Sequence, residues 1–299
     1  VALRRVVHNS TGVSDIMPQL GSMSHIYSGK LAKMKHPKAD TKRAVRQFWE
    51  NNPLSAAAIP FQPGSTEFFA AHTGLRKAET TPEVELWAYE PDTVQGKRLL
   101  DIGCGNGYVT CLYAEAGADV VAVDITDRAV ELTRARLALN GLDAEVKQAD
   151  AEALPFEDES FDVVVSFGVL HHTPDTEQAI EEARRLLKPG GRLLLMLYHR
   201  DSFAYRFLFR AKRWLQPTWR GKTADEQVNA VDGPDNPLGK VYSKPQVREL
   251  LKSFSEVEFR AASIFFRWAI LIPSPIRRQV EKRWGWHLFI KANKPQPHR

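Results

Sequence analysis

Residues 98 to 124, RLLDIGCGNGYVTCLYAEAGADVVAVD, decide the fold of this 299-residue chain. An apolar run ends at Asp101, glycines follow at positions 103, 105 and 107, and a helical pattern leads to a second apolar run that ends at Asp124. Glycine lets a backbone turn sharply and lets a ligand approach the main chain closely. The stretch therefore predicts a strand, a glycine turn, a helix and a second strand, with a ligand site at the turn.

The same alternation of strand and helix continues along the chain. Strand candidates are 98–102, 119–123, 144–147, 161–167 and 192–198, and the helical stretches between them are 108–116, 127–140 and 176–187. The helices stop where glycine or proline follows, at Gly117, at Gly141 and at the run Pro189-Gly190-Gly191. Apolar strands joined by helices indicate a parallel sheet that is covered on both faces and wound with right-handed crossovers. We therefore expect an α/β, doubly wound fold.

The glycine turn does not have the spacing of a dinucleotide site. A nicotinamide dinucleotide fingerprint is G-x-G-x-x-G, with the pyrophosphate at a helix N-terminus. Counted from Gly103, the third glycine would fall at position 108, which is Tyr108, whereas the chain has Gly107. The pattern therefore disfavours a nicotinamide-dependent oxidoreductase.

The two acids favour a different ligand. Asp101 stands directly before the turn, where a carboxylate would repel a pyrophosphate and would suit an ammonium or a sulfonium. Asp124 ends the second strand, where a carboxylate can accept hydrogen bonds from both hydroxyls of a ribose. Together they predict a nucleoside with a cationic tail and no phosphates.

Five motifs carry a resemblance to a known family. They are LLDIGCGNG (99–107), VVAVDIT (120–126), QADAEALPFEDESFDVV (148–164), FGVLHHTPD (167–175) and ARRLLKPGGRLLLML (183–197). In this order and spacing the chain resembles the class I S-adenosylmethionine-dependent methyltransferases, in particular the small-molecule subgroup of ubiquinone and menaquinone biosynthesis. The motifs cover residues 98 to 198, about a third of the chain.

The resemblance implies a Rossmann-like, seven-stranded sheet with the last strand antiparallel, S-adenosyl-L-methionine as cofactor, and a small-molecule methyl acceptor. The two late strand candidates, 257–262 and 287–292, fit such a sheet. The methionine part would lie on the turn, the ribose on Asp124, the adenine on Ile125 with its edge at Asp150 and Ala151, and the methyl group above Gly168 to His171. The cofactor-binding residues implied in this way are Asp101, Gly103, Cys104, Gly105, Asn106, Gly107, Asp124, Ile125, Asp150, Ala151 and Gly168.

Methyl transfer from a sulfonium is an in-line displacement, so alignment and exclusion of water matter most. His171 and His172 are the candidates for a base near neutral pH, and adjacent side chains point in different directions, so we expect at most one to face the substrate. A histidine that only orders the loop is the competing interpretation. The spacing of His, Cys and carboxylates around the pair predicts no metal site.

Aromatic residues are the candidates for binding the acceptor. Phe48 and Trp49 lie on a helical stretch before Pro53, and Tyr198 and His199 end the fifth strand. Phe207 and Trp214 lie in the segment 203–222, FAYRFLFRAKRWLQPTWRGK. Three interpretations of this segment stay open: a lid over an apolar substrate, a clamp for an anionic group, or a surface helix on lipid headgroups. Core packing competes with substrate binding for each of these aromatic side chains.

The order of these segments predicts four parts. They are an N-terminal arm and helical cap (1–95), with helices near 41–52, 67–77 and 82–89, the cofactor-binding core (96–198), an aromatic and basic lid insertion after the fifth strand (199–243), and a C-terminal helix with the last strands (244–299).

The composition indicates which kinds of partner and which cellular compartment to expect. The net charge is +5, and seven of the 23 residues from 200 to 222 are basic, which suits anionic ligands or anionic membrane surfaces. Two cysteines and an N-terminus without a continuous apolar core favour a cytoplasmic protein without disulfides. No known nucleic-acid module appears, so we expect no nucleic-acid partner, and peripheral membrane contact and the oligomeric state stay open.

Two further functions compete with methylation of a small molecule. One is a module that holds S-adenosylmethionine or its demethylated product without turnover. The other is methylation of a macromolecule, which the basic segment allows. The NPPY-like tetrapeptide of amino-group methylating enzymes is absent after the fourth strand, where this chain has FGVLHH.

Overall fold

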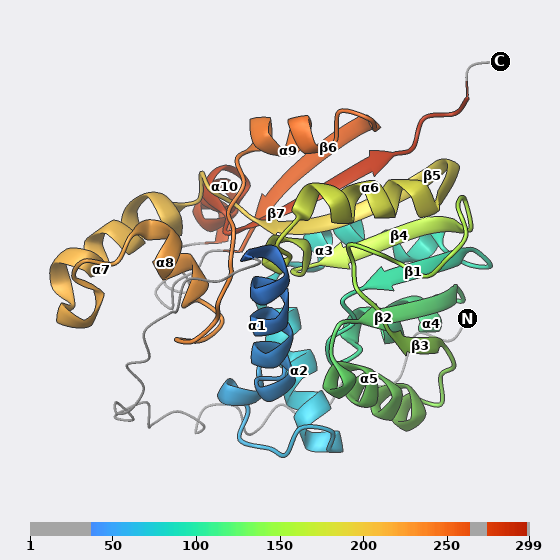
Figure 1. Ribbon diagram of the computed structural model, residues 1–299, viewed down its shortest axis with the longest axis horizontal. Helices are drawn as coiled ribbons and strands as arrows, with labels where there is room; N and C mark the ends of the chain where they lie inside the picture. Colours follow the sequence, from blue (N-terminus) through green and yellow to red (C-terminus); the bar gives the residue numbers. More distant parts are fainter. Residues whose placement is uncertain (1–36, 264–273, 298–299) are drawn as a thin grey trace. The chain divides into compact units, whose positions relative to one another are not determined.

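A mixed seven-stranded sheet forms the centre of the protein (Figure 1). The computed structural model describes residues 37–263 and 274–297, so residues 1–36 of the predicted N-terminal arm and helical cap lie outside the described residues. The strand order is β3-β2-β1-β4-β5-β7-β6, and β7 pairs antiparallel with both β5 and β6. The strands are β1 (Arg98–Ile102), β2 (Asp119–Asp124), β3 (Glu145–Gln148), β4 (Phe161–Phe167), β5 (Leu187–Tyr198), β6 (Ser255–Ala262) and β7 (His287–Asn293). The predicted doubly wound sheet with an antiparallel last strand is confirmed.

Helices cover both faces of the sheet because the strands are apolar on both faces. Leu99, Val163 and Val165 pack with α3 and α4, whereas Leu100 and Val164 pack with α6 and α9. Figure 1 shows α6 in front of the sheet and α4 behind it. The helices are α1 (Pro37–Asn51), α2 (Thr66–Glu79), α3 (Pro82–Tyr89), α4 (Tyr108–Glu115), α5 (Asp127–Asn140), α6 (Thr176–Leu186), α7 (Phe209–Leu215), α8 (Ala224–Asn229), α9 (Lys244–Leu250) and α10 (Ser274–Trp284).

The helix starts follow the expected capping chemistry. The Thr126 side chain accepts from the backbone N–H of Ala129 at α5, and Asp175 accepts from Gln178 at α6. Thr81 caps α3, which has Pro82 in its first turn. These caps fix the points at which the chain leaves the sheet edge and enters each helix.

The start of β5 differs from the prediction. The Pro189-Gly190-Gly191 run was expected to separate helix and strand, but β5 begins at Leu187 and contains it. The register against β4 shifts between Phe161 and Val163, and the Gly190 N–H donates to Lys294 O at 2.8 Å. The glycines therefore serve an irregular strand start that pairs with the C-terminal segment, because partners distant in sequence supply its hydrogen bonds.

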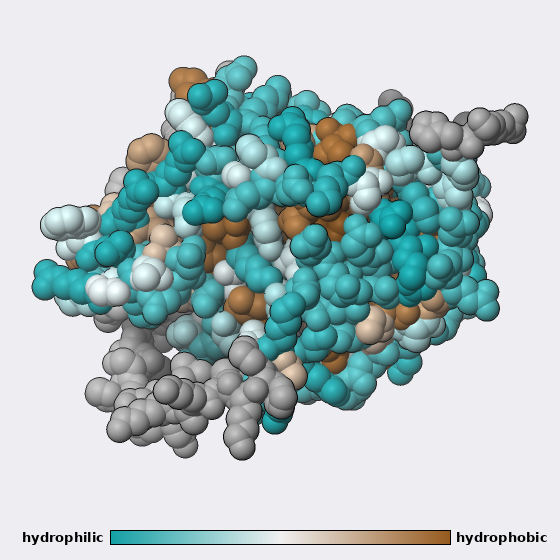
Figure 2. Space-filling model, turned by 45° about the horizontal axis from the view of Figure 1, so that its top comes forward, coloured by the Kyte–Doolittle hydropathy of each residue, from teal (hydrophilic) through white to brown (hydrophobic). Residues whose placement is uncertain are grey.

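The insertion after β5 is helical. It consists of η4 (Ala204–Leu208), which has π-helical hydrogen bonds, then α7, η5 (Pro217–Trp219) and α8, and it lies at the left of Figure 1. Phe209 anchors it, since this side chain is 1% exposed and its ring lies 5.7 Å from that of Trp286. Figure 2 shows a largely hydrophilic face on which apolar residues form separate patches. No helix within residues 37–263 and 274–297 has both the length and the apolar character needed to cross a bilayer.

Candidate active site

The glycine turn after β1 has a backbone that requires glycine. Gly103 has φ +82°, and a Cβ there would lie 2.3 Å from a Val169 methyl. Gly105 has φ +56°, but the nearest atom to its added Cβ would be Leu54 Cδ2 at 3.9 Å. Gly103 is therefore required for packing, whereas Gly105 keeps free space above the turn for a ligand.

Asp101 is a buried carboxylate at the base of this turn. It is 2% exposed, and the Thr110 hydroxyl donates to its Oδ2 at 2.7 Å. Burial, with a smaller contribution from the charge of Asp124, raises the pKa of Asp101 to about 7. A cationic ligand would stabilise the ionised form, so this position suits an ammonium or sulfonium group.

Asp124 lies across the turn at the end of β2. Its Oδ2 accepts from the Gly105 N–H at 3.1 Å, and its Oδ1 accepts from the Thr126 N–H and hydroxyl at 3.0 and 2.8 Å. Burial raises the pKa of Asp124, and these donors oppose the rise. The bonds hold the carboxylate in one orientation, and its remaining lone pairs could accept the two hydroxyls of a ribose.

Replacing Asp124 by alanine should weaken binding of S-adenosylmethionine at least tenfold. The change removes charge-assisted hydrogen bonds worth about 1.5–3 kcal/mol. Calorimetric titration measures the effect, with Asp119→Ala as the control, because Asp119 is an exposed carboxylate at the other end of the same strand. Equal affinities for the two variants would place the nucleoside elsewhere.

Helix α1 borders the end of the site that contains the glycine turn. Lys42 Nζ lies 2.6 Å from Asp150 Oδ2 and 2.6 Å from Glu152 Oε2. Burial alone would lower the pKa of Lys42, but the bonds to these two carboxylates raise it. Asp150, predicted to meet the adenine edge, therefore also holds α1 at the end of the sheet toward which the β1 arrow points (Figure 1).

One cleft of about 1130 Å³ joins these groups. Of the predicted cofactor-binding residues, all except Gly107 line it. Gly107 lies beneath, where its added Cβ would be 3.0 Å from the Thr133 backbone. Trp49, His172 and Tyr198 line the cleft among the predicted catalytic and acceptor residues, so it runs from the glycine turn to an aromatic, histidine-bearing end.

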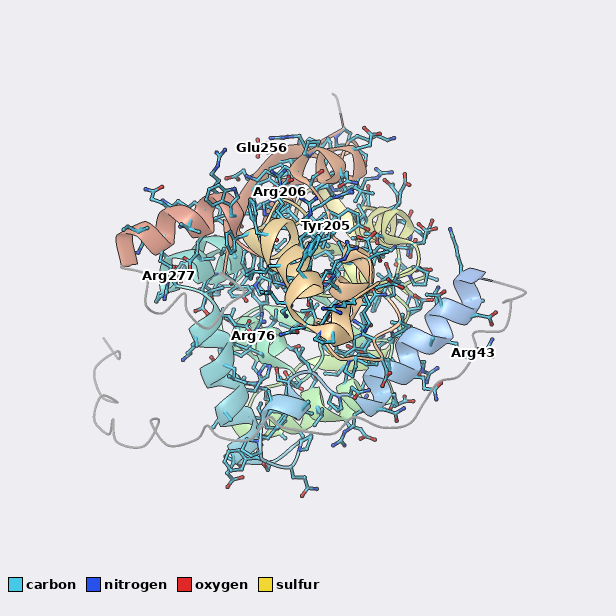
Figure 3. All side chains as sticks on the ribbon, turned by 90° about the vertical axis from the view of Figure 1, so that its left-hand side faces the viewer. Arg43, Arg76, Tyr205, Arg206, Glu256 and Arg277 are labelled. Atoms are coloured by element: carbon cyan, nitrogen blue, oxygen red, sulfur yellow. The ribbon has the colours of Figure 1, made fainter. Side chains whose placement is uncertain are left out.

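The structure does not bring the other predicted residues to the cleft lining, within the described part of the chain. Phe48 packs behind it against Gly233, and His199 is 1% exposed with Nδ1 at 3.0 Å from Gly285 O. Phe207 is 53% exposed and Trp214 84% exposed on the insertion, which Figure 3 shows at the Tyr205 and Arg206 labels. The insertion reaches the cleft instead through residues 231–234. Contact of the exposed Phe207 and Trp214 with a membrane stays a prediction.

His171 and His172 point in different directions, as expected from their adjacency. His172 lines the cleft, and its Nδ1 lies 2.6 Å from Leu238 O. His171 is fully buried, with its ring 3.9 Å from that of Tyr198 and both ring nitrogens without a partner among the described residues. His172 is therefore the histidine that can meet a substrate.

Replacing His171 by phenylalanine should make stability less dependent on pH. Burial, followed by the charges of His172, His287 and Lys240, lowers the pKa of His171 well below 6.5. The unfolded chain binds a proton below that pH while the folded protein does not, so the native state loses up to about 1.4 kcal/mol per pH unit from this group.

Urea unfolding at pH 7, 6 and 5 tests this expectation. The variant should lose stability less steeply than the natural chain as pH falls below 6.5. A constant cost from the larger phenylalanine ring would shift the free energy of unfolding without changing its slope. Parallel curves for the two proteins would show that His171 is protonated equally in the folded and unfolded states.

Two arginines from helices outside the sheet also line the cleft. Arg76 comes from α2 and Arg277 from α10 (Figure 3). Arg76 Nη1 lies 2.7 Å from Glu79, and Arg277 Nε lies 3.2 Å from Glu281. Burial and the charge of Arg76 lower the pKa of His287, beside Tyr198, to about 3. The two arginines can therefore bind an anionic substituent of an acceptor if they exchange their glutamate partners for it.

Sequence reasoning missed three residues of the site. Thr110 is the hydrogen-bond donor to Asp101, and Lys42 pairs with Asp150. Asp232 lies in a segment, VDGPDNPLGK, whose glycines and prolines indicate only a loop. Within the described residues no group of three or more His, Cys, Asp or Glu is arranged to hold a metal ion.

The comparisons with known proteins agree with this geometry. The family model of a methyltransferase domain matches residues 100–195. A ubiquinone biosynthesis O-methyltransferase of Stutzerimonas stutzeri is 35% identical over 122 residues, which are 40% of this chain and 53% of that protein. One of Roseobacter denitrificans is 36% identical over 115 residues, 38% of this chain and 46% of that protein. The chain thus spans about half the length of the curated relatives it matches.

Solved structures share the fold. A S-adenosylmethionine-dependent methyltransferase of Methanosarcina mazei aligns with a TM-score of 0.53 and 22% identity, over 73% of this chain and 99% of that one. A 4+2 cyclase aligns with a TM-score of 0.53 and 18% identity, over 86% and 97% of the two chains. The resemblance to class I S-adenosylmethionine-dependent methyltransferases is confirmed at the level of fold and domain, and S-adenosyl-L-methionine is the cofactor that this resemblance implies.

Proposed function

We propose that this protein is a S-adenosylmethionine-dependent methyltransferase that acts on a small organic acceptor. The observation that carries the proposal is the continuity of one cleft between two chemically different ends. One end has the buried Asp101, the open Gly105 and the oriented Asp124, and the other has Trp49, His172 and Tyr198. A cation-bearing nucleoside at the first end would direct its methyl group toward the second, above Gly168.

The residues of the cofactor end fit S-adenosylmethionine by their chemistry. Asp101 supplies a buried negative charge, Gly105 supplies space next to the backbone, and Asp124 supplies a carboxylate held by three donors. When bound, the cofactor would supply an electrophilic methyl group. The protein would align the acceptor with that group and exclude water, which are the main requirements of a displacement.

The far end supports an apolar or anionic acceptor. Trp49, Met196 and Trp286 provide apolar surface, while Arg76 and Arg277 provide positive charge. Similarity to ubiquinone biosynthesis O-methyltransferases supports an acceptor of quinone or prenyl type, and natural products of similar chemistry fit as well.

A transfer assay with methyl-labelled S-adenosylmethionine and fractionated cell extract tests the proposal. Label in the lipid-soluble fraction would support a quinone, sterol or prenyl acceptor, and label in small polar molecules would support an anionic one. Label in protein or nucleic acid would replace the proposal by macromolecular methylation. Bound cofactor with no transfer to any fraction would favour a non-catalytic binding module.

A further inference from the structure

A loop that follows the helical insertion brings a carboxylate into the cleft next to His172. Asp232 precedes Gly233, and both residues line the cleft together with His172 and Tyr198. The three side chains come from separate parts of the chain: η3 (Leu170–His172) after β4, the end of β5, and the loop after α8. We propose, on the basis of the proposed function, that His172 and Asp232 form a proton-accepting pair that serves a hydroxyl acceptor, with Tyr198 as a positioning residue.

The hydrogen bond of His172 to the main chain identifies the nitrogen that can act. Leu238 O, 2.6 Å from Nδ1, can only accept, so Nδ1 carries a hydrogen and donates it. Nε2 is then the nitrogen that can take a proton, and it lies 3.5 Å from Asp232 Oδ2. This distance is longer than a good hydrogen bond, as is common for catalytic pairs before substrate binds.

Hydrogen bonds fix the orientation of the Asp232 carboxylate. The Tyr198 hydroxyl donates to Oδ1 at 2.8 Å, and Asn236 Nδ2 lies 3.4 Å from Oδ2. Its side chain is 15% exposed, and the neighbouring Gly233 packs so closely on Phe48 that an added Cβ would lie 3.0 Å from the ring. Tyr198, Asn236 and the packing of Phe48 on Gly233 thus fix the position of this carboxylate.

The charges around the pair favour a neutral imidazole that is ready to accept a proton. Burial lowers the pKa of His172, while Asp232 and the Leu238 carbonyl oppose this change. Burial raises the pKa of Asp232, opposed by His172, Tyr198 and Asn236. Three rings pack against His172: Trp49 at 5.3 Å, His171 at 4.3 Å and Tyr198 at 5.8 Å. Burial lowers the pKa of His171 well below its usual value, so this ring adds no charge near neutral pH. Asp232 is thus the anion nearest to an imidazolium formed at this position.

The chemistry balances for a hydroxyl group. The acceptor oxygen forms a bond to the methyl carbon as the bond from that carbon to sulfur breaks and leaves its electron pair on sulfur. The acceptor O–H proton passes to His172 Nε2, and the Asp232 carboxylate stabilises the resulting imidazolium. The proton leaves to water with the methyl ether product, so the pair returns to its starting state.

The first test needs no acceptor. Nitrogen-15 NMR of the histidines, with the ligand-free protein and with added S-adenosylhomocysteine, follows the titration of His172 and its tautomer. Asp232→Asn should lower the pKa of His172 by about one or more, because an anion within a few ångströms is removed. Asp235→Asn, an exposed neighbour in the same loop, should leave it unchanged. The same His172 titration in both variants would overturn the proposal.

The second test uses the extract fraction that accepts label from methyl-labelled S-adenosylmethionine. Asp232→Asn should lower kcat about a hundredfold with little change in cofactor affinity, and should alter the pH profile of kcat. The variant removes the charge that stabilises the His172 imidazolium, and a general base contributes about 10²–10⁴-fold. Tyr198→Phe, which keeps the ring but no longer orients Asp232, should lower kcat less. Unchanged kcat and pH profile in Asp232→Asn would reduce the pair to a structural contact.

These outcomes are distinct from failure of the proposed function. If S-adenosylmethionine does not bind the natural chain, the function itself is wrong. If it binds equally well to the natural chain and to Asp232→Asn and both transfer label at the same rate, only the proton-accepting role is wrong.

Discussion

Replacing Asp101 by asparagine should remove most of the affinity for S-adenosylmethionine and at the same time stabilise the ligand-free protein. Asp101 is buried, and none of the groups that shift its pKa is a cation. Burial therefore raises this pKa to about 7. Removing one partner of a buried charge pair costs about 3–5 kcal/mol, so we expect a loss of at least about a hundredfold in affinity.

The gain in stability follows from the sign of the pKa change. The folded protein holds a proton on Asp101 up to about pH 7, whereas the unfolded chain releases it near its ordinary value of 3.8. The native state therefore loses stability as pH rises between these values, at up to about 1.4 kcal/mol per unit. Asparagine removes this loss, so at pH 8 the variant should gain up to about 4 kcal/mol.

Urea unfolding and calorimetry at pH 6, 7 and 8 measure both effects. In the natural chain, affinity should fall as pH drops below about 7, because a proton must leave Asp101 before the cation binds. Asp162→Asn is the control. Burial raises the pKa of this partly exposed carboxylate, but the bonds from Lys188 and the Arg98 N–H outweigh burial and hold the pKa below its usual value. That variant should lose stability and keep its affinity. A destabilised Asp101→Asn that binds cofactor normally would contradict our placement of the cation.

Replacing Gly105 by alanine should weaken cofactor binding by up to about a hundredfold while the protein still folds. Its φ of +56° costs an alanine about 1–2 kcal/mol, but the added Cβ would meet nothing closer than 3.9 Å. That Cβ would occupy the space where the ligand must approach the backbone. Overpacking of this kind costs about 1–3 kcal/mol, up to about a hundredfold in affinity.

Gly141→Ala is the matched control for this substitution. Gly141 also has a left-handed φ, +64°, and its added Cβ would meet nothing within 4 Å, but it caps α5 and does not line the cleft. Both variants should lose similar stability in urea, and only Gly105→Ala should lose cofactor affinity in calorimetry. Equal affinities would mean that the ligand does not approach Gly105.

Local patterns were enough to predict the sheet and the meeting of Asp101 and Asp124 at one edge of it. Apolar strands such as Phe161–Phe167, with helix caps between them, depend mainly on neighbours in sequence. Asp101 and Asp124 come together because parallel strands end at the same edge of the sheet. This geometry follows from topology alone, so two acids at strand ends are sufficient to predict it.

The other end of the cleft could be predicted only in part, because distant segments form it. Asp232 lies next to His172 because the insertion packs back onto the sheet, where its Phe209 ring contacts that of Trp286. Aromatic composition predicted a lid, but it does not distinguish the buried Phe209 from Phe207 and Trp214, which are exposed. Helix α10 has a basic sequence, SPIRRQVEKRW, with few apolar positions, and it was not predicted.

The most direct test of the central claim is a calorimetric titration of the protein with S-adenosylmethionine and, separately, with NAD. We predict one S-adenosylmethionine site per chain, which Gly105→Ala weakens by up to about a hundredfold. We predict no binding of NAD, because Tyr108 stands where a dinucleotide turn needs its third glycine. Binding of NAD without binding of S-adenosylmethionine would contradict the account and would assign the cleft to a dinucleotide.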